Sequence, residues 1–150
     1  VFIDQHQVID AFNKGEFTEP VVVVLAHQGP RANGMPELHK LTPILGILQD
    51  QGLPVALVTD GRMSGASGKV LSAIHVCPEA KADGPISRLR DGDVVRVDAN
   101  EGVLHTSADL SQREPMPTPA QAVSHGRGYF KVWRNTVTSA EEGASNLFTE

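Results

Sequence analysis

A glycine-rich loop in the first half of the chain carries side chains that could bind an anion. It runs from Asp60 to Lys69 and holds three glycines, two serines, Arg62 and Lys69. Glycine permits positive φ and a close backbone approach, so that consecutive amides can converge on one anion. The loop therefore predicts a site for an anionic substrate or an oxyanion. A connecting loop with solvated charges would have the same composition, and that alternative stays open at this point.

Two well-known motifs do not fit this loop. In a phosphate-binding P-loop that ended at Gly68-Lys69, Met63 would occupy the position of the first glycine, and Val70 stands in place of the required Ser or Thr. In a hydrolase nucleophile elbow the serine lies between two glycines, but those around Ser64 are misplaced and Ser67 lacks the second one. The loop is therefore neither a nucleotide-binding P-loop nor a hydrolase elbow.

A second polar loop, Gln28–Glu37, contains one carboxylate near several basic residues. Glu37 is that carboxylate, and Arg31, His39 and Lys40 are close to it in sequence. A carboxylate in this position could ligate a metal ion. A glutamate just before an apolar helix also stabilises the helix dipole, and the spacing alone does not separate the two roles.

Each of the two loops follows an apolar run that indicates a buried strand, and the arrangement of these strands determines where the loops lie. Val21–Leu25 precedes the first loop and Val55–Val58 precedes the second, with a helix opened by Thr42 as N-cap between them. Such a strand–helix–strand unit has parallel strands. Because parallel strands end at one edge of a sheet, we expect both loops to face one pocket.

The remaining elements indicate a mixed α/β domain whose second half is largely β. The other predictions are a capping box at Asp4–Gln7 with a helix that stops at Gly15, a strand or short helix at Val70–Val76, strands at Ile86–Leu89, Val94–Asp98 and Val103–Thr106, a linker at Ser111–Pro119 and a helix at Tyr129–Ala140. We expect one domain over residues 1–150, with a core at 20–110 and a tail at 111–150.

The composition narrows the class of protein. The 150 residues carry 13 Lys and Arg against 18 Asp and Glu, with no basic stripe, which argues against a nucleic-acid partner. The longest apolar run, Val21–Ala26, is too short to cross a bilayer, and the first residues do not resemble a signal peptide. The single cysteine, Cys77, fits a reducing compartment such as the cytoplasm. The opening without Met, directly on a helix signal, predicts a piece of a longer protein.

Several ordered motifs resemble the C-terminal domain of the dihydroxy-acid dehydratase and 6-phosphogluconate dehydratase family. They are Gln28–Leu38, Val58–Ser67, Pro78–Ala80, Gly84–Ile86 and Asp91–Asp93. Within the family, four segments are similar in sequence to the 6-phosphogluconate branch: Arg31–Gly34, Leu38–Pro43, Met63–Ser67 and Ala140–Ser145.

The resemblance implies a dehydration of a 2,3-dihydroxy acid to a 2-keto acid. In this branch the implied substrate is 6-phospho-D-gluconate and the product is 2-keto-3-deoxy-6-phosphogluconate, as in the Entner–Doudoroff route. By motif, Ser64 matches the base that takes the C2 proton, and Glu37 matches a ligand of a divalent metal, expected to be magnesium. Arg31, Arg62, Ser67 and Lys69 are the candidates for substrate binding.

The resemblance also implies what surrounds the domain. Family members use an iron–sulfur cluster, four-iron in this branch, and one cysteine cannot hold it, so we expect the cluster ligands on an N-terminal domain that this chain lacks. The implied fold is a β-rich swivelling-type domain, related to one in aconitase-like enzymes, with a partly open β barrel flanked by helices. We expect a homodimeric full enzyme and an inactive fragment.

Other functions stay open. One alternative is a dihydroxy-acid dehydratase or another sugar-acid dehydratase, since no phosphate specificity is provable from the sequence. Another is a free-standing domain with a structural or regulatory role.

Overall fold

A three-stranded parallel sheet forms the centre of the computed structural model, which describes residues 1–64, 68–120 and 128–147. Its strands are β1 (Val21–Leu25), β2 (Val55–Thr59) and β3 (Leu71–Ala73), in that order across the sheet. Val21 lies opposite Val55, and Ala56 lies opposite Leu71. The predicted parallel strand–helix–strand unit is confirmed, and the segment after the glycine-rich loop is a strand rather than a helix.

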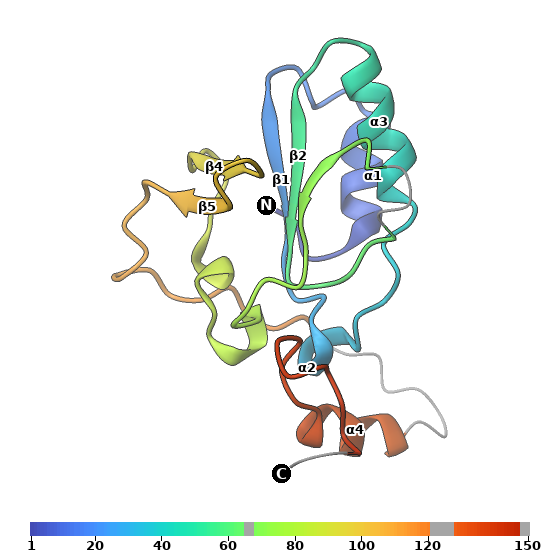
Figure 1. The fold of residues 1–150 in the computed structure, drawn as a ribbon, viewed down its shortest axis with the longest axis vertical. Helices are drawn as coiled ribbons and strands as arrows, with labels where there is room; N and C mark the ends of the chain where they lie inside the picture. The colour runs from blue at the N-terminus through green and yellow to red at the C-terminus, as the bar shows by residue number, and fades with distance from the viewer. Residues whose placement is uncertain (65–67, 121–127, 148–150) are drawn as a thin grey trace.

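Helices α1 (Gln5–Asn13) and α3 (Leu41–Asp50) cover one face of this sheet (Figure 1). Alternate strand residues point to opposite faces, so that Val23 and Leu57 pack with the helices, while Val24 and Val58 join a second cluster on the other face. The predicted capping box of α1 is present at Asp4.

The helix α3 begins two residues earlier than predicted, and Thr42 is not its N-cap. Lys40 occupies that position, without a side-chain cap. The amide of Leu41 donates to the carbonyl of Leu38 at 3.0 Å, and both leucines are fully buried. Apolar burial therefore sets the start of the helix, and Thr42 lies within its first turn.

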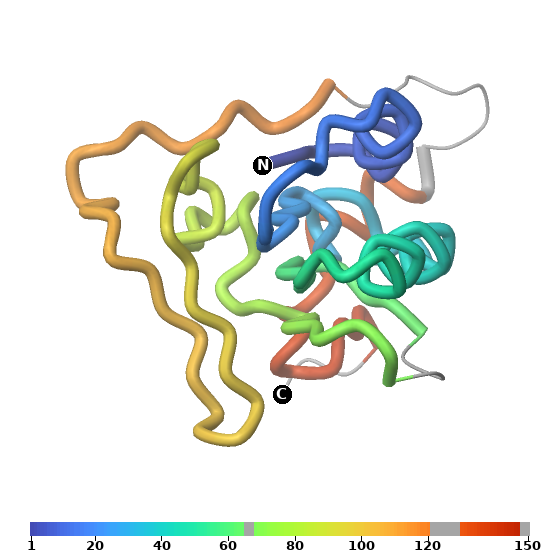
Figure 2. The backbone as a smooth tube through the Cα atoms, turned by 90° about the horizontal axis from the view of Figure 1, so that it is seen from above, coloured from blue at the N-terminus to red at the C-terminus, as the bar shows by residue number. Residues whose placement is uncertain are grey.

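The second face of the sheet is covered by two 3-10 turns and a hairpin. The turns are η1 (Ala80–Ala82) and η2 (Pro85–Arg88), and the antiparallel hairpin consists of β4 (Val95–Asp98) and β5 (Val103–Thr106). Figure 2 shows the hairpin, in yellow, at the side of the molecule, and the chain that follows it, in orange, returning across the top of the view. The mixed α/β class is confirmed, and in the described part of the chain the two sheets do not close into a barrel.

The strand predicted at Ile86–Leu89 is wrong, because this segment forms η2. Proline at position 85 has no amide to donate to a strand partner and fixes its own φ. The amide and the hydroxyl of Ser87 both bond to the carbonyl of Gly84, at 2.9 and 2.7 Å. The resulting turn buries Ile86 and Leu89 in the second cluster.

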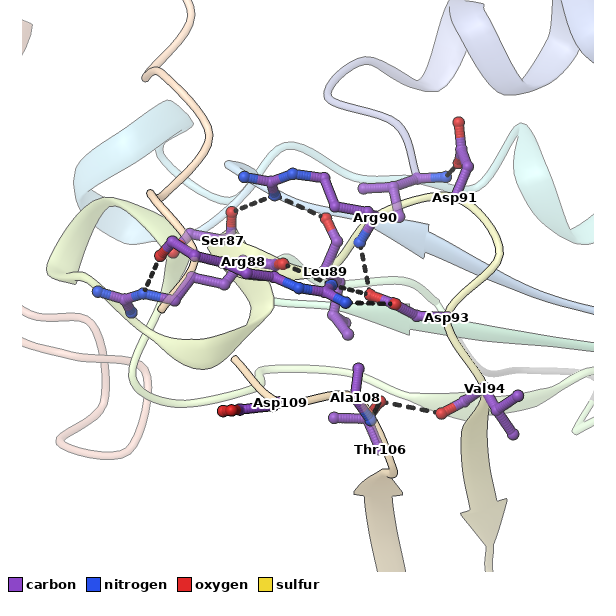
Figure 3. Close-up of polar contacts among 12 residues, drawn as sticks. Ser87, Arg88, Leu89, Arg90, Asp91, Asp93, Val94, Thr106, Ala108 and Asp109 are labelled. Atoms are coloured by element: carbon purple, nitrogen blue, oxygen red, sulfur yellow. Dashed lines mark hydrogen bonds and ion pairs between the residues drawn. The ribbon is translucent and has the colours of Figure 1, made fainter. Parts of the chain in front are cut away.

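Hydrogen bonds of arginine side chains tie the proline-rich segment to these turns. Figure 3 labels Arg88, Arg90 and Asp93 of this network. The carboxylate of Asp93 accepts from the guanidinium of Arg113, at 3.0 Å for one pair of atoms, and from the amide of Arg90 at 2.8 Å. The amide of Met116 donates to the carbonyl of Ser87 at 2.7 Å. Residues 111–119 form no helix or strand, as the prolines predict, yet side chains hold the segment in place.

The tail returns to the loop that follows β1. The helix α4 (Gly128–Thr136) ends four residues before the predicted boundary, and the next residue, Val137, is buried. Figure 1 shows α4 beside α2 (Pro30–Asn33), below the sheet. No helix among the described residues has the length and apolar character needed to cross a membrane.

Candidate functional site

Glu37 and Ser64 are in direct contact. The loops after β1 and β2 meet in a single parallel bridge between Glu37 and Arg62, where the amide of Leu38 donates to the carbonyl of Arg62 at 3.2 Å. Two residues further on, the amide of Ser64 donates to Oε1 of Glu37 at 2.6 Å. The structure therefore brings the serine and the carboxylate to one point at the edge of the sheet.

Arg62 adds a positive charge beside this contact. Its Nη1 lies 3.8 Å from Oε2 of Glu37, and its Nε donates to the carbonyl of Met35 at 2.7 Å. About half of the Arg62 side chain and a third of the Glu37 side chain are exposed. The carboxylate is thus held by one hydrogen bond and one ion pair and is still accessible from outside the domain.

A tight turn before Glu37 sets its position. Gly34 and Met35 both have positive φ, 71° and 52°, in the left-handed region. Gly34 ends α2 there, and its amide donates to the carbonyl of Pro30 at 3.1 Å. These two residues reverse the chain after α2 and direct Glu37 toward the second loop.

Asp60, a buried residue whose role was not predicted from the sequence, holds together the segments that carry the site. It has no solvent exposure, and its carboxylate accepts from the amides of His27 at 3.2 Å, Gln28 at 2.8 Å and Ala80 at 2.8 Å. Burial raises the pKa of Asp60 above its ordinary value, and the amides of Ala80 and Gln28 partly oppose this. One side chain thus joins the ends of β1 and β2 to η1.

Glu79 is a second missed anchor, at the start of α2. Its carboxylate oxygens accept from the amides of Arg31 and Ala32, each at 3.0 Å. A Cβ on Gly29 would lie 2.4 Å from Oε2 of Glu79, so the close approach requires glycine here. The sequence signal was available, because Gly29-Pro30 opens a helix without a side chain that could cap it, and the cap comes from a distant acid.

His27 is also buried and was not singled out from the sequence. It is 2% exposed, has a φ of 61°, and lies close enough to Asp60 to affect the pKa of that carboxyl. Neither ring nitrogen has a hydrogen-bond partner in the described part of the chain.

The four predicted substrate-binding side chains separate in the structure. Arg62 is at the Glu37–Ser64 contact, as described above. Arg31 points to the tail instead, where its Nε donates to the carbonyl of Val137 at 3.2 Å. Lys69 lies against α3 and pairs with Asp50. Ser67, together with Gly65 and Ala66, lies outside the described residues, so the predicted convergence of their amides stays a prediction.

A small pocket connects Ser64 with Lys69. Its volume is about 200 Å³. The described residues that line it are Thr42, Met63, Ser64, Gly68, Lys69, Val70, Ser72 and Ile74.

The described residues form no group of three His, Cys, Asp or Glu side chains that could bind a metal ion. Glu37 could therefore supply one oxygen ligand but not a complete site. Cys77 is a single, partly buried thiol, which does not fit the several thiolates of an iron–sulfur cluster.

Comparison with known proteins decides the family. Residues 1–144 match the family model described as dihydroxy-acid/6-phosphogluconate dehydratase, C-terminal. The chain belongs to this family. It is 57% identical to the phosphogluconate dehydratase of Pseudomonas aeruginosa over 100% of its length, and 52% identical to that of Zymomonas mobilis over 99%.

The same comparison favours one branch of the dehydratase family. A dihydroxy-acid dehydratase from Streptococcus suis is 38% identical over 99% of the chain, below the values for the two phosphogluconate dehydratases. The chain spans about a quarter of the length of these relatives, 25% of the first two and 26% of the third.

Proposed function

We propose that this chain is the C-terminal domain of a 6-phosphogluconate dehydratase, and that Ser64 is the base in the dehydration. The observation that carries the proposal is the contact between Ser64 and Glu37, in a chain that belongs to this dehydratase family. The higher identity to phosphogluconate dehydratases supports 6-phosphogluconate as the substrate.

The proposed role of Ser64 is to accept the proton from carbon 2 of the substrate. The C2–H bond breaks, the proton moves to the serine oxygen, and the hydroxyl on carbon 3 leaves as water with a proton from an acid outside this chain. The resulting enol becomes the 2-keto acid. The hydrogen bond from the Ser64 amide to Glu37 fixes the backbone of the serine while its side chain reacts.

A serine hydroxyl titrates far above neutral pH, so Ser64 needs stabilisation as an alkoxide. Glu37 is an accessible carboxylate and fits one ligand position of a magnesium ion, whose charge would lower the pKa of nearby oxygen groups. Arg62, beside Glu37, contributes positive charge from this chain itself.

The rest of the enzyme must supply what this chain does not hold. The proposal places the remaining metal ligands and the iron–sulfur ligands on an N-terminal domain. It also takes the full enzyme to be a cytoplasmic homodimer. The swivelling, aconitase-like character of the domain belongs to the proposal as well, and its support is the parallel sheet with a separate hairpin packed on one face.

The substrate is tested with the full-length enzyme loaded with its cluster and magnesium. We expect keto-acid formation from 6-phosphogluconate with a kcat/KM at least about a hundredfold above that for branched-chain dihydroxy acids, a difference of about 3 kcal/mol in transition-state binding. Equal or greater activity on the branched acids would favour the dihydroxy-acid dehydratase alternative. A full open reading frame that encodes no cysteine-bearing domain upstream of this chain would favour the alternative of a non-catalytic structural or regulatory domain.

A further inference from the structure

The pocket beside Ser64 has a lining that favours an anion at one end of a ligand. The polar residues that line it are Thr42, Ser64, Ser72 and Lys69, and the described lining includes no carboxylate. Its volume of about 200 Å³ is below the roughly 300–1,000 Å³ of a complete small-molecule site. The pocket therefore fits one end of a ligand whose other end lies at Ser64.

Lys69 lies along a single stripe of α3 that leads into this pocket. Thr42, Gly46 and Asp50 are spaced by four residues and so share one face of the helix. A Cβ on Gly46 would lie 3.3 Å from Cδ of Lys69, which shows that the lysine stem rests directly on the helix backbone. The lysine ammonium donates to Asp50 at the C-terminal end of the stripe.

The pair with Asp50 is easily exchanged. The Lys69 side chain is 42% exposed and that of Asp50 is 67% exposed. Ion pairs at such exposure contribute little to stability, because water and salt screen them. A doubly charged anion in the pocket would therefore compete well for the ammonium.

Thr42 marks the other end of the stripe. It lines the pocket, and its hydroxyl oxygen is shielded from solvent without a hydrogen-bond partner among the described residues. Because a shielded hydroxyl without a partner is unfavourable, a rotation of the Thr42 side chain that lets its hydroxyl donate to a ligand oxygen in the pocket would be favoured.

We propose that Thr42 and Lys69 bind the phosphate of the substrate, at the end opposite to the carbon that Ser64 deprotonates. In the absence of substrate, Asp50 holds the lysine ammonium, and on binding the ammonium moves past Gly46 toward Thr42. This rests on the proposed function, which places carbon 2 at Ser64 and so leaves the phosphate for the far end of the pocket.

The test compares Lys69→Met, Thr42→Val and Asp50→Asn in the full-length, cluster-loaded enzyme. For Lys69→Met we expect the KM for 6-phosphogluconate to rise about tenfold or more, because a charged contact is lost, with kcat at saturation changed by less than about threefold. Thr42→Val should raise the same KM by a smaller factor. The inhibition constant of gluconate, which lacks the phosphate, should not change in either variant.

The direction of the KM change in Asp50→Asn separates this proposal from a purely structural role of the Lys69–Asp50 ion pair. It removes the competing charge, so we expect the KM for 6-phosphogluconate to fall about twofold to fivefold. Lys14→Met is the matched control, because Lys14 is also an exposed lysine in an ion pair, with Glu16, and does not line the pocket. It should leave KM and kcat unchanged.

Several results would overturn the proposal. These are a 6-phosphogluconate KM in Lys69→Met that stays within twofold of the wild-type value, a gluconate inhibition constant that rises in parallel with that KM, or an Asp50→Asn enzyme whose KM is unchanged or higher. A wild-type enzyme that fails to dehydrate 6-phosphogluconate would instead contradict the proposed function, before any variant is compared.

Discussion

At the scale of single residues, the acids beneath the site differ in role from the acid within it. Glu37 is partly exposed and contacts Ser64 and Arg62, which suits an exchangeable ligand. Asp60 and Glu79 are buried and accept backbone amides from segments distant in sequence. Their role follows from those contacts: they fix the loops that carry Glu37 and Ser64.

The Asp60 contacts predict a large effect on stability. Replacing Asp60 with Ala leaves the amides of His27, Gln28 and Ala80 buried without their acceptor. Each such donor costs about 1–3 kcal/mol, so we expect the free energy of unfolding to fall by about 3 kcal/mol or more. Urea denaturation of the 150-residue chain measures this.

The control for Asp60 is Asp10→Ala, at an exposed position on α1. Substitutions at such positions change stability by about 0.5 kcal/mol or less. Equal losses at positions 60 and 10 would show that Asp60 does not anchor the loops.

At the scale of elements, the sequence predicted those that a strong local pattern specifies. The β-branched runs at β1 and β2 and the capping box at Asp4 appear as expected, because continuous burial and reciprocal capping are local signals. The segment at 86–89 was mistaken for a strand, since its apolar residues fit either a strand or a turn and only Pro85 distinguishes them.

The parts of the site that could not be predicted depend on contacts between distant segments. The Glu37–Ser64 hydrogen bond joins residues 27 apart, and the contacts of Arg31 with Glu79 and Val137 join residues 48 and 106 apart. No spacing rule indicates that Arg31 faces the tail. The edge of the sheet was predictable from parallel topology, whereas the direction of each side chain was not.

The contact between Asp93, in the turn before β4, and Arg113, in the proline-rich segment, predicts that the stability of the domain falls in acid. The hydrogen bond from the Arg113 side chain, more than that from the Arg90 amide, lowers the pKa of Asp93 below its ordinary value. A lowered folded-state pKa gives stability that is present above the unfolded value, 3.8, and is lost as the pH falls through the folded pKa.

We therefore expect Asp93→Asn to reduce the loss of stability on acidification. Urea midpoints of the wild type and the variant should differ at about pH 6, and the difference should shrink as the pH falls below the unfolded value, 3.8. Asp10→Asn, at the exposed position on α1, should parallel the wild type at both values. A constant difference between Asp93→Asn and the wild type across this range would contradict the assignment.

At the scale of the whole molecule, the domain presents a partial site at one edge. The chain spans about a quarter of the length of its dehydratase relatives. Its described residues offer Ser64, Glu37, Arg62 and the Lys69 pocket, but no complete metal site. The chemistry proposed for Ser64 therefore depends on groups from the rest of the enzyme.

This dependence predicts that the 150-residue chain is inactive by itself. Incubated with 6-phosphogluconate and magnesium, it should form no keto acid above the background without protein, because Ser64 lacks the environment that makes it a base. Product formation is followed by a keto-acid assay, and the full-length enzyme is the positive control. Turnover by the chain alone would contradict the need for a second domain.

The most direct test of the central claim is the kcat of Ser64→Ala in the full-length enzyme, compared with wild type at equal cluster and magnesium content. A positioned base contributes about 10²–10⁴-fold, so kcat should fall by at least about a hundredfold. A kcat close to the wild-type value, with the cluster intact, would show that Ser64 is not the base.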